Sequence, residues 1–129
     1  MQTHGYEHSA PWRQALALLD HVSALTSTFE EDAFGTGGKL RGMTADLPIR
    51  CAICFEQNEY DSVKSHATAI TEHLFKLLLQ AQVASHLGLL TARQLKALRK
   101  KLDALENAVT ALPDELFEDD GQDELKPAA

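Results

Sequence analysis

Two cysteines three residues apart, Cys51 and Cys54, form the pattern in this sequence that is closest to a reactive site. A C-x-x-C pair can carry a reversible disulfide or supply half of a zinc site. The redox pair is expected in a βαβ setting, and zinc would need two further ligands that no second C-x-x-C supplies. Both cysteines are in helical phase with Leu40, Met43 and Leu47. Because free cysteine is among the most buried residue types, we predict that both are small core residues.

The histidines are poorly spaced for binding a metal ion. His66 and His73 are seven residues apart, whereas two ligands on one helix are favoured at spacings of three or four. A di-iron bundle would carry Glu-x-x-His on two helices, and no histidine here has a glutamate three residues before it. The six are predicted to be solvated or to cap helices: His4, His8, His21, His66, His73 and His86.

No other motif indicates catalysis. The segment 35–38, Gly-Thr-Gly-Gly before Lys39, lacks the spacing of a phosphate-binding loop and predicts a flexible turn, whose N–H groups could hold an anion. The acidic cluster at 30–32 would need a pocket to act as an acid–base pair, and a small close-packed bundle gives little reason to expect one. We therefore predict a protein that is not an enzyme and that has no metal and no cofactor.

One cluster of bases is a candidate for binding nucleic acid. Five lie within nine residues: Arg93, Lys96, Arg99, Lys100 and Lys101. In a ring of subunits such patches would repeat, and their phosphate contacts would add through counterion release. The alternative is an ordinary solvated helix face, partly neutralised by the acidic C-terminal residues of the same chain, and the net charge of −7 favours it. No aromatic residue accompanies the cluster in the sequence to stack on bases.

These residues must be positioned by helices, because apolar residues recur at steps of three and four in two consecutive stretches. The first stretch comprises Val63, Ala67, Ile70, Leu74, Leu77, Ala81 and Ala84. The second comprises Leu95, Leu98, Leu102, Leu105, Val109 and Leu112. Since the connection at 87–91 is short, the two helices must fold back on each other as an antiparallel hairpin.

Two further helices complete the predicted fold. Ser9 and Pro11 suit the start of a helix over 10–29, and a second is expected over 39–56, kinked at Pro48. Gly88 is expected to end the helix over 61–87, and a capping box, Thr91 with Gln94, to begin the last one. The predicted class is all-α: an antiparallel up-down-up-down four-helix bundle.

The C-terminal residues differ in composition from the rest of the chain. Residues 113–129 contain seven acids and one base, whereas residues 1–112 carry a net charge of −1. Such an acidic segment with few apolar residues is typical of disorder, although Leu116 and Phe117 could pack against the bundle. We predict one bundle domain over 1–112 and a disordered acidic tail over 113–129.

Some apolar residues are left over once the core is assigned. They project from the far side of their helices: Ile49, Ile53, Phe75, Leu79 and Val83. A helix that is apolar nearly all round is buried on both sides, so these residues are predicted to form an interface between copies of the chain. The alternative is that some of them pack beneath the tail or the 30–38 loop.

Several of these features resemble a known family. The Leu40-Arg41 pair before Leu47-Pro48, and the stretch from Ala84 through the turn at 87–91, are similar to the bacterial four-helix-bundle proteins encoded in intervening sequences of large-subunit ribosomal RNA. The accessory proteins of diversity-generating retroelements are related to that family. The resemblance covers about residues 12–112. It implies a cytosolic, non-enzymatic bundle, often a homopentamer, and in the retroelement relatives binding of RNA and a reverse transcriptase.

The functional expectation combines these observations. We expect a cytoplasmic protein that assembles into a homo-oligomer, a pentamer by resemblance, and presents a surface to another protein. The second expectation is a nucleic-acid accessory protein that uses the bases at 93–101. No apolar run approaches the ~18 residues that would predict a membrane span.

Overall fold

The chain folds into a bundle of helices. The computed structural model describes residues 5–30 and 32–117, and that part of the chain is helical and contains no strand. The elements are the 3₁₀ helix η1 (Gly5–His8) and the helices α1 (Ala10–Thr26), α2 (Thr36–Cys54), α3 (Tyr60–His86), α4 (Ala92–Thr110) and α5 (Leu112–Leu116). Most of the predicted acidic tail, together with His4 and Glu31, lies outside the described residues. No described helix has the length and apolar character that crossing a membrane requires.

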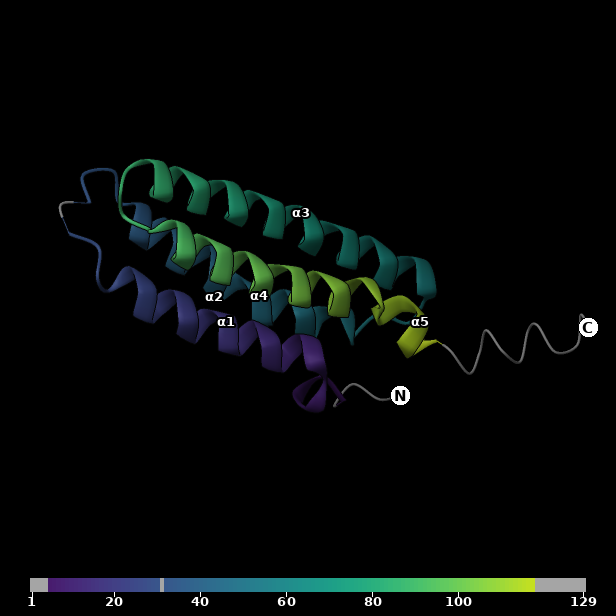
Figure 1. Cartoon of the computed structure of the whole chain (residues 1–129). Coiled ribbons are helices and arrows are strands. Elements are labelled where there is room, and N and C mark those ends of the chain that lie inside the picture. The colour runs from purple at the N-terminus through teal and green to yellow at the C-terminus, as the bar shows by residue number, and fades with distance from the viewer. Residues whose placement is uncertain (1–4, 31, 118–129) are drawn as a thin grey trace, which may run out of the picture.

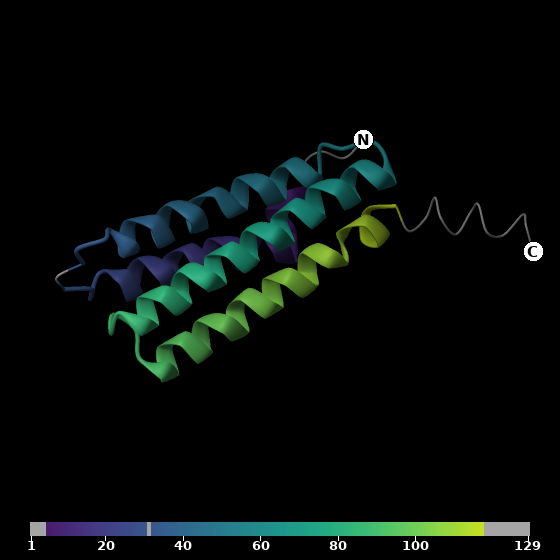
Figure 2. The ribbon, with the colours of Figure 1, turned by 90° about the horizontal axis from the view of Figure 1, so that it is seen from above.

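The four long helices lie side by side (Figures 1 and 2). Helix α1 packs against α2, α2 against α3, α3 against α4, and α4 against α1, which closes the ring around one core. The α1–α2 loop and the α3–α4 turn lie at one end of the bundle, and α5 lies at the other (Figure 1). The all-α bundle predicted from the sequence is confirmed.

The apolar seam of α3 is the inner face of that helix. Its buried residues are Val63, Ala67, Ile70, Leu74, Leu77, Ala81 and Ala84, the same seven that the spacing selects. On α4 the buried residues are Leu98, Leu102, Leu105 and Val109. Leu95 is half-buried and packs against this core.

Most helix ends follow the predicted capping chemistry. The Ser9 side chain accepts a hydrogen bond from the Trp12 N–H at the start of α1. Thr91 and Gln94 form both bonds of a capping box at the start of α4. Gly88 follows α3 with φ = 82°, a left-handed conformation that glycine adopts without steric cost.

Helix α2 begins earlier than predicted, at Thr36 rather than Lys39. The Asp32 carboxylate accepts hydrogen bonds of 2.8 Å from the N–H groups of both Thr36 and Gly37. These bonds hold the pKa of Asp32 below its usual value, the Gly37 N–H having the largest effect. The expectation of a flexible turn with free N–H groups is therefore wrong at this position, because the chain's own carboxylate satisfies them. Helix α2 then continues through Pro48, which is buried.

The end of α1 also differs from the prediction, since the helix stops at Thr26 and not at Phe29. The hydroxyls of Thr26, Ser27 and Thr28 donate to carbonyls three or four residues earlier. Such side-chain bonds compete with continuation of the helix. Phe29 then packs against the core from the loop.

A short helix follows α4 and lies against α3. Leu112 and Pro113, at the start of α5, are buried. The Tyr60 hydroxyl donates a 2.8 Å hydrogen bond to the Asp114 carboxylate, and the rings of Tyr60 and Phe117 are 6.4 Å apart. The chain up to Phe117 is thus held beside the N-terminus of α3.

Candidate functional site

Each of the five surplus apolar residues has a large exposed fraction. On α2 the exposed fraction is 59% for Ile49 and 39% for Ile53, and we call this pair the α2 row. On α3 it is 60% for Phe75, 43% for Leu79 and 49% for Val83, and we call these three the α3 row. The described residues leave both rows uncovered, so neither the 30–38 loop nor the start of the tail packs over them.

The two rows lie in different halves of the bundle. A hydrogen bond of 2.9 Å from the His73 ring N–H to the Met43 carbonyl places these two residues at the same level on α3 and α2. Counted from that level at about 1.5 Å per residue, Ile49 and Phe75 are about 12 Å apart along the bundle axis. The α2 row is near the start of α3, and the α3 row is near the turn before α4. The structure therefore presents two apolar patches, which the sequence grouped as one interface.

The α2 row borders two shallow grooves. On one side Ile49 and Ile53 adjoin Tyr6 and Trp12, whose rings make an edge-to-face contact with centroids 4.9 Å apart. On the other side the same two isoleucines face His66 on α3. The apolar surface at this end of the bundle thus extends across η1, α1 and α2.

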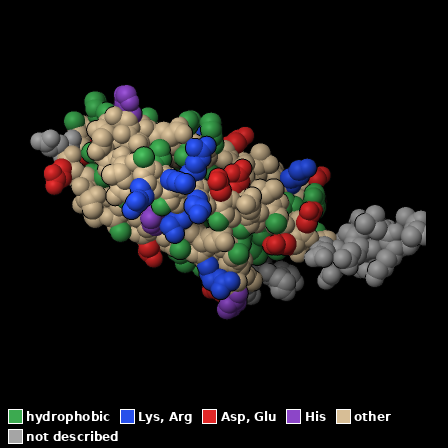
Figure 3. Space-filling model, in the orientation of Figure 1, with side chains coloured by type: hydrophobic (Ala, Val, Ile, Leu, Met, Phe, Trp, Pro, Cys, Tyr) green, Lys and Arg blue, Asp and Glu red, His purple; other side chains and the backbone are tan. Residues whose placement is uncertain are grey.

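The five bases form an exposed cluster on α4, and we call it the basic patch. All five of its side chains are exposed: Arg93, Lys96, Arg99, Lys100 and Lys101. Lysine and arginine side chains gather over the first half of α4 in Figure 3. Among the described residues the ion pair within 4.0 Å is Arg50–Asp46 on α2, so no described carboxylate neutralises the basic patch at that distance.

The basic patch and the α3 row are neighbours. Because α3 and α4 run side by side from the turn at 87–91, residues equally far from that turn lie at the same level (Figures 1 and 2). Leu79 is therefore level with Arg99. Thr71 on α3 and Thr110 on α4 line one groove between these helices. Phe75 lies one helical turn after Thr71, and Arg99 lies three helical turns before Thr110, so each is on the same side of its helix as the threonine. By the same count Phe75 is level with Asp103, about one turn beyond Arg99, which the sequence did not indicate because Phe75 belongs to another helix.

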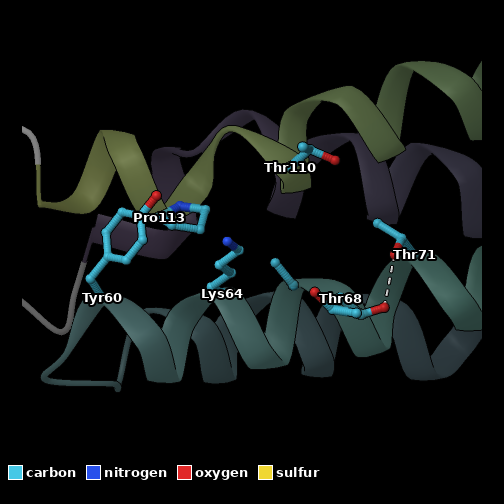
Figure 4. Close-up of a pocket in the computed structure, with 7 residues that line it drawn as sticks. Tyr60, Lys64, Thr68, Thr71, Thr110 and Pro113 are labelled. Atoms are coloured by element: carbon cyan, nitrogen blue, oxygen red, sulfur yellow. Dashed lines mark hydrogen bonds between the residues drawn. The ribbon is translucent and has the colours of Figure 1, made fainter.

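The groove between α3 and the α4–α5 segment is shown in Figure 4. It encloses about 120 Å³, and Lys64 points into it from α3 while Thr110 and Pro113 face it from the other side. The Thr71 hydroxyl donates to the Thr68 carbonyl and is thereby occupied within its own helix. The lining supplies one ammonium group and several hydroxyls, and one of these hydroxyls, on Tyr60, donates to the Asp114 carboxylate. That hydrogen bond is the largest cause of a raised pKa of Tyr60.

Both cysteines are buried. Burial raises the pKa of Cys51 to about 12, with a further contribution from Cys54. Burial likewise raises the pKa of Cys54 to about 11. Both residues are free thiols in the core of α2, as the spacing predicted. A reactive cysteine needs a lowered pKa, so this pair lacks the property that its chemistry requires.

Two histidines take structural positions between helices. His73 bonds to the α2 backbone, as described above. His21 on α1 is half-buried, and its Nε2 atom is buried without a hydrogen-bond partner. Burial lowers the pKa of His21, and the positive charge of Lys101 on α4 lowers it further. In the described part of the chain, no three His, Cys, Asp or Glu side chains lie close enough to hold a metal ion.

In comparisons with known proteins, no family model and no curated protein sequence matches the chain.

Proposed function

We propose that this protein is a non-enzymatic four-helix bundle that assembles into a homo-oligomer and presents the assembled surface to another protein. The proposal includes an antiparallel up-down-up-down path, a kink at Pro48 and a cytoplasmic location. The family resemblance implies that the homo-oligomer is a pentamer. The observation that carries it is the exposure of the two apolar rows. Within the α3 row three large apolar side chains at four-residue spacing are 43–60% exposed, and exposed apolar patches on a protein surface often mark interaction sites.

The energetics favour covering the α3 row. Burial of apolar surface contributes about 25 cal/mol per Å², and aromatic and aliphatic side chains at the centre of an interface contribute most. Phe75 and Leu79 are one helical turn apart, so one partner helix can contact both. A symmetric contact between copies uses such a patch twice.

The buried thiols support a role that does not involve catalysis. Cys51 and Cys54 are the chain's two potential sulfur nucleophiles, and their raised pKa values keep them protonated. The lining of the groove in Figure 4 contains no thiol and no imidazole, and its Tyr60 hydroxyl is already bonded to Asp114. The chemistry available at the surface is therefore binding, through apolar side chains on α2 and α3 and through bases on α4.

The decisive experiment is the solution mass by light scattering over a wide range of concentration. We expect a multiple of the 14.2 kDa chain mass for the wild type. Leu79→Glu should reduce it toward one chain, because a buried unpaired charge at the interface is costly. Ser23→Glu adds the same charge on the exposed side of α1 and should leave the mass unchanged. A wild type that stays at one chain mass throughout would overturn the proposal.

A second candidate function is favoured by the basic patch. Its five exposed bases have no ion-pair partner among the described residues, and the exposed ring of Phe75 lies on the neighbouring helix α3, about one turn beyond the level of Arg99. Positive charge gives phosphate contacts, and an aromatic ring gives a stacking surface for single-stranded bases. On this reading the protein is an RNA or nucleoprotein accessory factor.

Binding of a single-stranded RNA oligonucleotide at low salt tests this second function. The triple variant Arg93→Ala, Lys96→Ala and Lys100→Ala should weaken binding and make the salt slope less steep by about 2, at ~0.7 per phosphate contact. The variant Lys39→Ala with Lys76→Ala removes charge elsewhere and should change binding less. Equal losses in the two variants would show that the basic patch is not the site.

A further inference from the structure

The basic patch concentrates positive charge, and no described carboxylate pairs with its bases within 4.0 Å. Its five bases lie along fewer than three turns of α4. Like charges at spacings of three and four residues repel one another on a helix. The described ion pair, Arg50–Asp46, lies on α2 and does not relieve this repulsion. An acidic partner would therefore gain from every contact with this face.

The chain itself carries an acidic segment of matching charge. Residues 118–124 contain five acids in seven positions and no base. The sequence that supplies this charge is Glu-Asp-Asp-Gly-Gln-Asp-Glu. Five negative charges follow directly after the last described residue, Phe117.

The described structure fixes where that segment starts. The Tyr60–Asp114 hydrogen bond and the contact between the Tyr60 and Phe117 rings hold Phe117 beside the start of α3. Lys100 is level with Leu78, about 27 Å along the bundle axis from Tyr60 at about 1.5 Å per residue. Seven extended residues span up to about 24 Å, and the lysine side chain covers the remainder. Acids at 123 and 124 can thus reach Lys100 and Lys101.

We propose that residues 118–124 dock along α4 of the same chain and place the acids at 123 and 124 on Lys100 and Lys101, the end of the basic patch nearest to Phe117. The tether at Phe117 makes this contact intramolecular, and the segment must be nearly extended to make it. The contact is electrostatic and therefore weakens with salt. A polyanion must displace the segment before it reaches Lys100 and Lys101.

The chain offers a matched control for reach. Lys76 is exposed on α3, about 24 Å along the axis from Tyr60, and is nearly as far from Phe117 as Lys100 is. It lies outside the basic patch. Lys64 is unsuitable as a control, because it lies in the groove beside Tyr60 and Pro113, close to the start of the segment.

The test is zero-length carbodiimide cross-linking of the full chain, followed by peptide mass spectrometry. Mixing ¹⁴N- and ¹⁵N-labelled protein separates links within a chain from links between chains. We expect acids of 118–124 to link to Lys100 and Lys101 several-fold more than to Lys76, with each yield normalised to the acetylation reactivity of that lysine. The excess should disappear at ~1 M NaCl, where the Debye length is about 3 Å.

A variant keeps the reporter lysine while it removes the attraction. Arg93→Gln, Lys96→Gln and Arg99→Gln leave Lys100 in place and should lower its yield to that of Lys76. Equal yields for Lys100 and Lys76 in the wild type, an absence of links, or links that join different chains would each overturn the proposal. None of these outcomes depends on whether the α3 row forms an interface, so the proposal fails or stands separately from the assembly.

Discussion

The two faces of α3 are both apolar, yet one is explained by the fold and the other is not. Leu77 is fully buried in the seam, whereas Leu79, two residues later, has an exposed fraction of 43%. Helix α2 repeats the arrangement, with Cys51 and Cys54 inside and the α2 row outside. The inner faces hold one chain together. The outer faces contribute nothing to that core, and assembly is the cause that we propose for their apolar character.

The largest expected difference between the inner and outer faces is in the rate at which thiols on them are alkylated. At pH 8 a thiol with a pKa of about 11 is ionised about once in a thousand molecules, against roughly a quarter for an unperturbed thiol of pKa ~8.5. Alkylation of Cys51 and Cys54 in the native protein should therefore be at least about a hundredfold slower than in urea. An introduced thiol on the exposed side of α2, in Ala45→Cys, should react at the rate of a free thiol. Comparable native rates at all three thiols would contradict the burial of the inner face.

Truncating one leucine on each face of α3 compares how much the two faces contribute to the free energy of unfolding. Leu77→Ala should lower the free energy of unfolding by about 2–5 kcal/mol, because it removes buried methyl groups and leaves a cavity. Leu79→Ala should change it by about 0.5 kcal/mol or less in the separated chain, since its side chain is largely in water there. Urea denaturation followed by circular dichroism at low protein concentration measures both. If Leu79→Ala becomes more destabilising as concentration rises, the outer face contributes through association.

The sequence predicted the inner faces well because burial follows helical periodicity. Each of the seven seam residues of α3 is buried, and Gly88 and the Thr91–Gln94 box mark the boundaries where local chemistry placed them. The missed start of α2 depends on a side chain that acts across a loop. Asp32 begins α2 from four residues upstream, and no periodic pattern reports that contact.

The sequence predicted which residues form the candidate surfaces, but not where these surfaces lie relative to one another. Periodicity identified the outward direction of both rows and of the basic patch. It could not give the offset of α2 against α3, which the His73–Met43 hydrogen bond fixes and which separates the two rows. It also could not place Phe75 beside α4, since that proximity depends on how two helices pack across the turn.

His21 lies at the boundary between the inner and outer faces, and it gives the smallest and most local prediction. Burial and then the charge of Lys101 lower its pKa from 6.5, so the folded chain favours the neutral ring. Its contribution to stability is therefore complete above pH 6.5 and is lost as the pH falls through the folded-state pKa. Lys101→Gln should raise the pKa of His21 in an NMR titration, whereas Lys100→Gln removes the same charge from the neighbouring position and should raise it less. Equal shifts would mean that His21 senses the whole basic patch, and that Lys101 is no closer to α1 than its neighbour.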